Sequence, residues 1–258
     1  MLGAIAGDII GSIYEFDKKK PEYDFQLFHK YSHFTDDTVL TVALADSILF
    51  ETPYIDKVIE YYHLYPDAGY GGMFRQWAAN NGRHPYNSFG NGSAMRVSPV
   101  GWAYNDLDTV LQKAKESAEI THNHPEGIKG AQATASAIFL ARQKTSKAEI
   151  KDFITENFNY NLDFELEELR EHYRFNETCQ GTVPQAIYTF FISKTFEDSI
   201  RKAIYIGGDS DTLACINGSI AEAYYGIPAY ILEQIYKKLD NRLTQKTKQF
   251  VKKYINHR

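Results

Sequence analysis

Three glycines recur at every fourth position near the start of the chain, in the apolar run Gly3-Ala-Ile-Ala-Gly7-Asp8-Ile-Ile-Gly11. If this run is a helix, the glycines lie on one face, because residues four apart share a face. Inside a helix a glycine costs about 0.8–1 kcal/mol relative to alanine, so a repeated glycine indicates a compensating role. The stripe predicts that a second backbone approaches this helix closely in the core.

Helical patterns cover most of the remaining chain, and convincing alternating strand patterns are absent. The acids at the start of Asp36 to Phe50 complement a helix dipole. Pro125 and Pro184 are each expected in a first helical turn, where proline is tolerated. Further helices are expected at Leu107 to Ala118, Pro125 to Arg142, Pro184 to Ile192 and Asp211 to Tyr225. We predict an all-α fold, with one compact domain over residues 1–258.

The stretch from Pro66 to Gly101 has a different composition, since it is rich in glycine and asparagine. This composition is typical of loops. The stretch is too long for a simple connector, and long loops often carry function.

Composition limits the class of protein. Of the 258 residues, 43% are hydrophobic and 24% are charged, as in an ordinary globular protein. The formal net charge of -5 argues against a uniformly basic nucleic-acid-binding surface. Two cysteines do not make a disulfide framework and fit a reducing cytoplasm. No stretch approaches the roughly 18 uncharged apolar residues of a membrane span. We expect a cytoplasmic monomer without membrane contact.

Two short clusters carry carboxylates beside hydroxyls at apparent helix starts. The first is Thr35-Asp36-Asp37-Thr38, and the second is Asp209-Ser210-Asp211-Thr212. Oxygen ligands of this kind suit hard cations such as Mg²⁺, Mn²⁺ or Ca²⁺. Each cluster alone is also typical of a helix cap. If the fold brings four carboxylates together, they repel one another, and a pair of divalent cations is the natural compensation.

Five motifs, taken in order, resemble those of the ADP-ribosylglycohydrolase family. They run from an opening glycine motif that ends at Glu15 to a second metal motif that ends at Thr212. They are Gly3 to Glu15, Phe34 to Thr38, Gly90 to Arg96, Thr121-His122 with Gly127 and Gly130, and Gly207 to Thr212. The ordered set is far more specific than any one motif.

The resemblance implies an all-α fold with two divalent cations in a cleft, usually Mg²⁺, with Mn²⁺ or Ca²⁺ as alternatives. All six of the family's ligand positions are matched: Thr35, Asp36, Asp37, Asp209, Asp211 and Thr212. Asp36 and Asp37 are also candidate catalytic groups, since nearby carboxylates can accept a water's proton and stabilise a cationic ribose. Glu15 matches a mobile glutamate of the serine-directed branch and is the third candidate catalytic residue.

Candidate substrate-binding residues surround the phosphates of ADP-ribose. Glycines let backbone N–H groups approach a pyrophosphate, which makes Gly71, Gly72, Gly90 and Gly92 candidates. Ser88, Asn91 and His122 match family positions that contact ADP-ribose. Phe89 is a stacking candidate or a core residue, and His124 is a rival to His122 that periodicity does not exclude.

The function implied is hydrolysis of the N- or O-glycosidic bond between ADP-ribose and a modified protein, nucleic acid or small molecule, with ADP-ribose as product. One alternative is hydrolysis of a free ADP-ribose derivative or another phosphorylated ribose compound. The other is a binding or structural relative that has lost activity. Retention of all six ligand positions disfavours this last alternative.

Overall fold

The computed structural model describes residues 1–16 and 19–256 of the chain. The helices are α1 (Leu2–Gly11), α2 (Asp36–Phe50), α3 (Tyr54–Leu64), α4 (Gly72–Ala79), α5 (Gly92–Met95), α6 (Ser98–Ala103), α7 (Leu107–Glu119), α8 (Pro125–Arg142), α9 (Lys147–Phe158), α10 (Leu166–His172), α11 (Cys179–Phe191), α12 (Phe196–Tyr205), α13 (Ser210–Tyr225), α14 (Ala229–Lys238), α15 (Asn241–Phe250) and a π-helical turn (Val251–Ile255). The described part of the chain contains no strand, so the predicted all-α class is confirmed.

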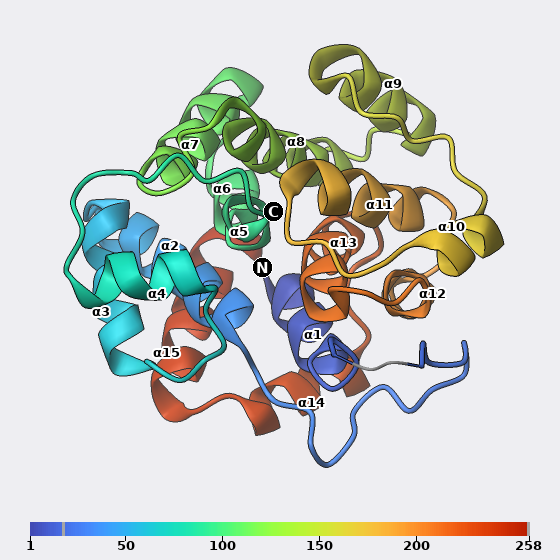
Figure 1. Cartoon of the computed structure of the whole chain (residues 1–258), viewed down its shortest axis with the longest axis horizontal. Helices are drawn as coiled ribbons and strands as arrows, with labels where there is room; N and C mark the ends of the chain where they lie inside the picture. The colour runs from blue at the N-terminus through green and yellow to red at the C-terminus, as the bar shows by residue number, and fades with distance from the viewer. Residues whose placement is uncertain (17–18, 257–258) are drawn as a thin grey trace.

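Helices α1 and α13 pack against each other at the centre of the fold (Figure 1). A Cβ atom added to Gly7 would lie only 1.9 Å from the carbonyl oxygen of Ala214, and one added to Gly3 would lie 2.0 Å from that of Gly218. The two backbones are therefore in direct contact, as the glycine stripe predicts. Every residue of α1 is buried.

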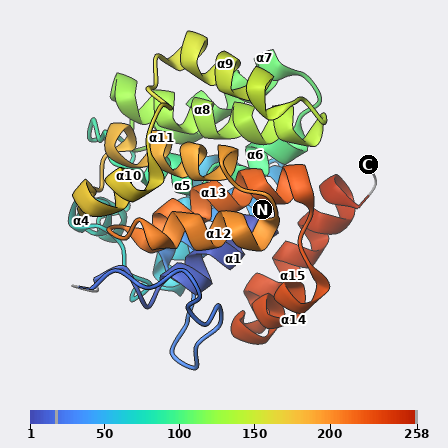
Figure 2. The same cartoon turned by 90° about the vertical axis from the view of Figure 1, so that its right-hand side faces the viewer.

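The other helices form layers around this pair. Helices α8, α11 and α12 each pack on α13. Figure 2 shows α7, α8 and α9 on one side of the central pair, with α14 and α15 on the opposite side. Among the described residues, no helix has both the length and the apolar character to cross a bilayer.

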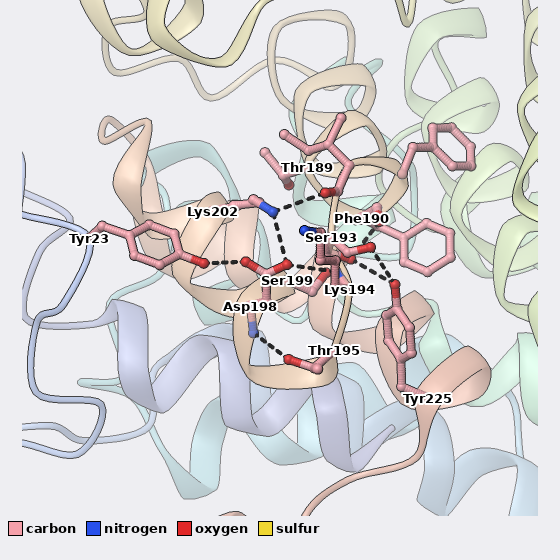
Figure 3. Close-up of polar contacts among 12 residues, drawn as sticks. Tyr23, Thr189, Phe190, Ser193, Lys194, Thr195, Asp198, Ser199, Lys202 and Tyr225 are labelled. Carbon is pink, nitrogen blue, oxygen red and sulfur yellow. Dashed lines mark hydrogen bonds and ion pairs between the residues drawn. The ribbon is translucent and has the colours of Figure 1, made fainter.

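A polar network fixes the start of α12 against its neighbours (Figure 3). The Asp198 carboxylate accepts hydrogen bonds from Lys202 Nζ (2.8 Å) and from the backbone N–H of Lys194 (2.6 Å). It also accepts one from the Tyr23 hydroxyl, which ties the segment after α1 to α12. Nearby, the Tyr225 hydroxyl at the end of α13 donates to the Ser193 carbonyl at 2.7 Å. These contacts join the start of α12 to the segment after α1, and the loop before α12 to the end of α13.

Two helix predictions are wrong in detail. Pro184 lies inside α11, because this helix begins at Cys179, where the Thr178 hydroxyl accepts a hydrogen bond from the N–H of Gly181. The stretch from 66 to 101 is not a continuous loop, since it contains α4, α5 and the first part of α6. The buried side chains of Phe74 and Trp77 anchor α4 to the core and stabilise a helix despite the glycine-rich surroundings.

We expect Gly7→Ala to lower the free energy of unfolding by about 3 kcal/mol, because the new methyl group would overlap the α13 backbone, which cannot move aside. Gly72→Ala is the matched control, since nothing lies within 4 Å of a Cβ at that helical glycine. Urea unfolding followed by circular dichroism measures both. Equal stabilities of the two variants would contradict the close α1–α13 contact.

Candidate metal and substrate cleft

The first carboxylate cluster lies at the start of α2 and is held from α1. Thr35 caps the helix, and its hydroxyl accepts a hydrogen bond from the N–H of Asp37 at 3.3 Å. Asp8 accepts three hydrogen bonds, from the Thr35 N–H (2.9 Å), the Thr35 hydroxyl (2.7 Å) and the Thr38 N–H (3.0 Å). The buried carboxylate of α1 therefore fixes the backbone that carries Asp36 and Asp37.

The second cluster lies at the start of α13, after two glycines with left-handed backbone conformations. Gly207 has φ 74° and Gly208 has φ 79°, which favour glycine at both positions. The turn places Asp209 at the N-cap, where its Oδ2 accepts a hydrogen bond of 2.6 Å from Asn91 Nδ2. The glycine-rich loop of the chain thus contacts the second cluster directly.

The two clusters face each other across the cleft. The Thr212 hydroxyl donates to Asp37 Oδ2 at 3.3 Å, which joins residues 175 positions apart. Carboxylate oxygens of Glu15, Asp209 and Asp211 lie within 4.8 Å of one another. The predicted convergence of the carboxylates is therefore present in the fold.

This arrangement is electrostatically unfavourable without a cation. Burial, reinforced by the charge of Asp8, raises the pKa of Asp36 and of Asp37 well above the usual range. Burial and the charge of Asp209 do the same to the pKa of Asp211. Burial followed by the charge of Asp209 raises the pKa of Glu15 to about 7.

Asp37 Oδ1 is buried and has no hydrogen-bond partner among the described residues. An orphaned oxygen within an all-oxygen donor set fits a hard divalent cation.

A cavity of about 800 Å³ opens over these carboxylates. Its lining contains nearly all the residues predicted from the sequence: Glu15, Thr35, Asp36, Asp37, Gly71, Gly72, Ser88, Gly90, Asn91, Gly92, His122, Asp209, Asp211 and Thr212. Phe89 is the exception, since it lies outside the lining. Its ring is 45% exposed and lies 5.3 Å from that of His124.

Backbone contacts hold the glycine-rich loop in shape. Gly90 forms an isolated antiparallel bridge with Thr178, and the N–H of Asn91 donates to the Glu177 carbonyl at 2.7 Å. The Ser88 hydroxyl accepts a hydrogen bond from the N–H of Gly90 at 3.1 Å. The loop is therefore braced from the segment before α11 rather than left free.

The structure separates the two rival histidines. His122 is 5% exposed and lines the cavity. His124 instead caps α8, where its Nδ1 accepts a hydrogen bond of 3.1 Å from the N–H of Glu126. Local spacing could not distinguish them, because the difference depends on where α8 begins.

Three residues near the cleft were missed by the sequence reasoning. Asp8 had a signal, as the one charged residue in an otherwise apolar and glycine-striped run. Arg96 also had one, since it ends the glycine-rich motif, and it is fully buried while lining the cavity. Glu177 lines the cavity from a segment whose sequence carries no recognisable pattern.

Comparison with known proteins places this chain among the hydrolases of glycosidic bonds. The chain belongs to the ADP-ribosylglycohydrolase family, whose sequence model matches residues 1–258.

Individual relatives agree with this assignment. The mouse protein named ADP-ribosylhydrolase ARH3 is 28% identical, over 88% of this chain and 83% of its own length. An uncharacterized protein of Archaeoglobus fulgidus is 33% identical over 77% of this chain and 74% of its own. The ADP-ribosylarginine hydrolase Tri1 of Pseudomonas putida is 22% identical over 96% and 76%. A solved structure described as an ADP-ribosylglycohydrolase-related protein complex shares the fold, with a TM-score of 0.71, 23% identity and coverage of 96% of this chain and 95% of that chain.

In the metal-free protein at pH 7, we expect Asp37→Asn to raise the free energy of unfolding. The raised pKa means that the ionised carboxylate destabilises the folded state at this pH, and the amide removes that charge. Asp8→Asn is the contrasting variant. Burial raises the pKa of Asp8 as well, but its carboxylate accepts three hydrogen bonds, and an amide NH₂ would face those N–H and O–H donors. We therefore expect a loss of about 2 kcal/mol. Urea unfolding in the presence of a chelator measures both. Similar losses in the two variants would refute repulsion within the cluster.

Proposed function

We propose that this chain hydrolyses the glycosidic bond between ADP-ribose and a modified target, using two divalent cations. The proposal rests on one observation: the two carboxylate clusters meet in the lining of the cavity, where the Thr212–Asp37 hydrogen bond joins them. A family model over the whole chain supports an ADP-ribosyl substrate.

The proposed metal ligands are Thr35, Asp36, Asp37, Asp209, Asp211 and Thr212. Two features of the chain support this set: the unpartnered buried Oδ1 of Asp37, and the raised pKa values that a cation would offset. We propose Mg²⁺, with Mn²⁺ or Ca²⁺ as alternatives. When bound, such cations hold ribose hydroxyls and lower the pKa of a water nucleophile.

Glu15, Asp36 and Asp37 are the proposed catalytic residues. Glu15 is half-buried, and its carboxylate lies close to those of Asp209 and Asp211, a position from which it can accept a proton from a water at the cluster. Cleavage at the anomeric carbon builds positive charge on the ribose ring. The carboxylates of Asp36 and Asp37 would stabilise that charge.

The glycine-rich part of the cavity lining is proposed to bind the rest of ADP-ribose. Gly71 and Gly72 present backbone with open space around it, because nothing lies within 4 Å of a Cβ at either position. Gly90, Gly92, Ser88, Asn91 and His122 complete the proposed phosphate side. A role for Phe89 in stacking stays a prediction, since its ring lies outside the cavity lining.

The modified target is proposed to be a macromolecule that protrudes from the cleft. The mouse relative is named an ADP-ribosylhydrolase and the Pseudomonas putida relative an ADP-ribosylarginine hydrolase. Because Glu15 matches the glutamate of the serine-directed branch, we favour a serine linkage over an arginine linkage.

We propose a reducing cytoplasm as the compartment of this protein, because both cysteines are buried and unpaired.

The test of this function is release of ADP-ribose from arginine-, serine- and DNA-linked substrates, with and without Mg²⁺. We expect Mg²⁺-dependent release from at least one of them. Release only from a free ADP-ribose derivative or another phosphorylated ribose compound would replace the proposal by that alternative. Binding of ADP-ribose without any release would favour an inactive relative.

We expect exhaustive chelation to abolish turnover, and Mg²⁺ to restore it. Asp211→Asn should reduce turnover at limiting Mg²⁺ by at least about 10²-fold, because the loss of one ligand charge weakens metal binding. Asp163→Asn is the control, since that carboxylate is 84% exposed and remote from the cavity. Full activity of the chelated protein, with metal shown to be absent, would exclude the two-metal mechanism.

We expect Glu15→Gln to lower the single-turnover rate by about 10²–10⁴-fold, the usual range for a lost acid–base group. The dissociation constant of ADP-ribose should change much less, because the proposed phosphate loop is intact. Glu22→Gln, at an exposed carboxylate outside the cavity lining, is the control. Equal losses in rate and affinity would make Glu15 a ground-state binding residue instead.

A further inference from the structure

Arg96 is a buried cation whose charge is not balanced by a carboxylate. The side chain is fully buried, and none of the ion pairs in the described chain includes it. Its Nη2 donates to the Ser117 carbonyl at 2.9 Å and to the Thr121 hydroxyl at 2.8 Å. An unpaired buried charge destabilises a fold, so the presence of Arg96 in the cavity lining requires an explanation.

The Thr121 hydroxyl, which contacts Arg96, also contacts His122. Thr121 Oγ1 lies 2.7 Å from His122 Nδ1. A guanidinium group only donates, so Thr121 Oγ1 accepts from Arg96. The one hydroxyl hydrogen of Thr121 then points to His122 Nδ1, since the described residues offer it no other acceptor. The hydroxyl oxygen has a second lone pair that an Nδ1–H could use, but the hydroxyl hydrogen would then be buried without an acceptor. The arrangement therefore favours an unprotonated Nδ1 and a hydrogen on Nε2.

His122 Nε2 lies beside Gly90 and Gly92 of the glycine-rich loop. A Cβ added to Gly92 would lie 3.1 Å from this nitrogen, and one added to Gly90 would lie 3.5 Å from it. Among the described residues, Nε2 makes no hydrogen bond. These short distances place Nε2 against the loop itself. Since His122 lines the cavity, an N–H at Nε2 that has no partner in the described chain is available to a ligand there.

We propose that Arg96 and Thr121 are positioning residues that fix His122 as the Nε2–H tautomer, so that this N–H donates to an anionic oxygen of the ligand above Gly90 and Gly92. The identity of that ligand, the diphosphate of ADP-ribose, rests on the function proposed above. The tautomer itself is a property of the free protein and does not depend on that function.

The surroundings of His122 keep the ring neutral. Burial, followed by the positive charge of Arg96, lowers the pKa of His122 well below its usual value. Tyr86 also lies beside the ring, with its centroid 6.1 Å from that of the imidazole. In a chain of hydrogen bonds that starts at a cation, each donor polarises the next. The Nε2–H would therefore be a stronger donor than that of an isolated neutral histidine, without a change of charge in the cleft.

The tautomer is measured by two-bond ¹H–¹⁵N correlation spectra of the ¹⁵N-labelled full-length chain, free of ligand. His122→Gln assigns the signals by difference. We expect the wild-type ring to show a protonated Nε2 and an unprotonated Nδ1. A protonated Nδ1 in the wild-type protein would overturn the proposal, and this result needs no variant beyond the one used for assignment.

Thr121→Val and Thr121→Ser form a matched pair, because only serine keeps the hydroxyl. We expect Thr121→Ser to retain the wild-type tautomer and ADP-ribose affinity. Thr121→Val should give a mixture of tautomers and weaken ADP-ribose binding by roughly 10-fold, the order expected for one lost hydrogen bond to a charged group. A Thr121→Val protein with the wild-type tautomer and affinity would overturn the relay. If the wild-type chain did not bind ADP-ribose at all, the proposed function would fail, whereas the spectra of wild type and both variants would still decide the relay.

Discussion

The contact between the backbones of α1 and α13 sets the geometry of everything else in the cleft. Glycines at every fourth position of α1 allow an approach that a single methyl group would prevent. This approach brings the start of α13, with Asp209 and Asp211, beside the end of α1, where Glu15 follows. The same helix carries Asp8, which holds the start of α2 through three hydrogen bonds. One packing constraint therefore positions three acidic segments that are far apart in the sequence.

The acidic segments gain some stabilisation from the helices on which they lie. Both α2 and α13 begin at the cleft, and the positive end of a helix dipole favours a carboxylate by roughly 0.3–1 kcal/mol. This stabilisation is smaller than the destabilisation that burial and mutual repulsion cause. Burial and repulsion raise the pKa values of Asp36, Asp37 and Asp211 well above their usual range. The fold thus maintains an unfavourable concentration of charge. A structural role would not require it, whereas binding of a divalent cation would.

Sequence patterns predicted the features that depend on local periodicity. The helix from Asp36 to Phe50 and the glycine stripe are found as expected, because both follow from spacing and side-chain size. The beginning of α11 was misplaced, since its cap at Thr178 carries more weight than the general preference of proline for a first turn. Within the candidate site, the carboxylate motifs were found because each is contiguous. The relay from Arg96 through Thr121 to His122 was not, because it joins separate elements and no spacing rule connects them.

Charge is unevenly distributed over the lining of the cavity, and this bears on how a substrate can enter. The lining combines the carboxylate cluster and Glu177 with the backbone of the glycine-rich loop, and Arg96 is a buried cation in the same lining. ADP-ribose carries its negative charge on the diphosphate, whereas its terminal ribose offers only hydroxyl groups. An uncompensated carboxylate cluster would repel the diphosphate, because a low-dielectric cleft screens charges weakly. Cations bound by the carboxylates and the positive charge of Arg96 would both reduce that repulsion. Binding of metal and binding of ADP-ribose would then favour each other thermodynamically, with no requirement for a change in the shape of the fold.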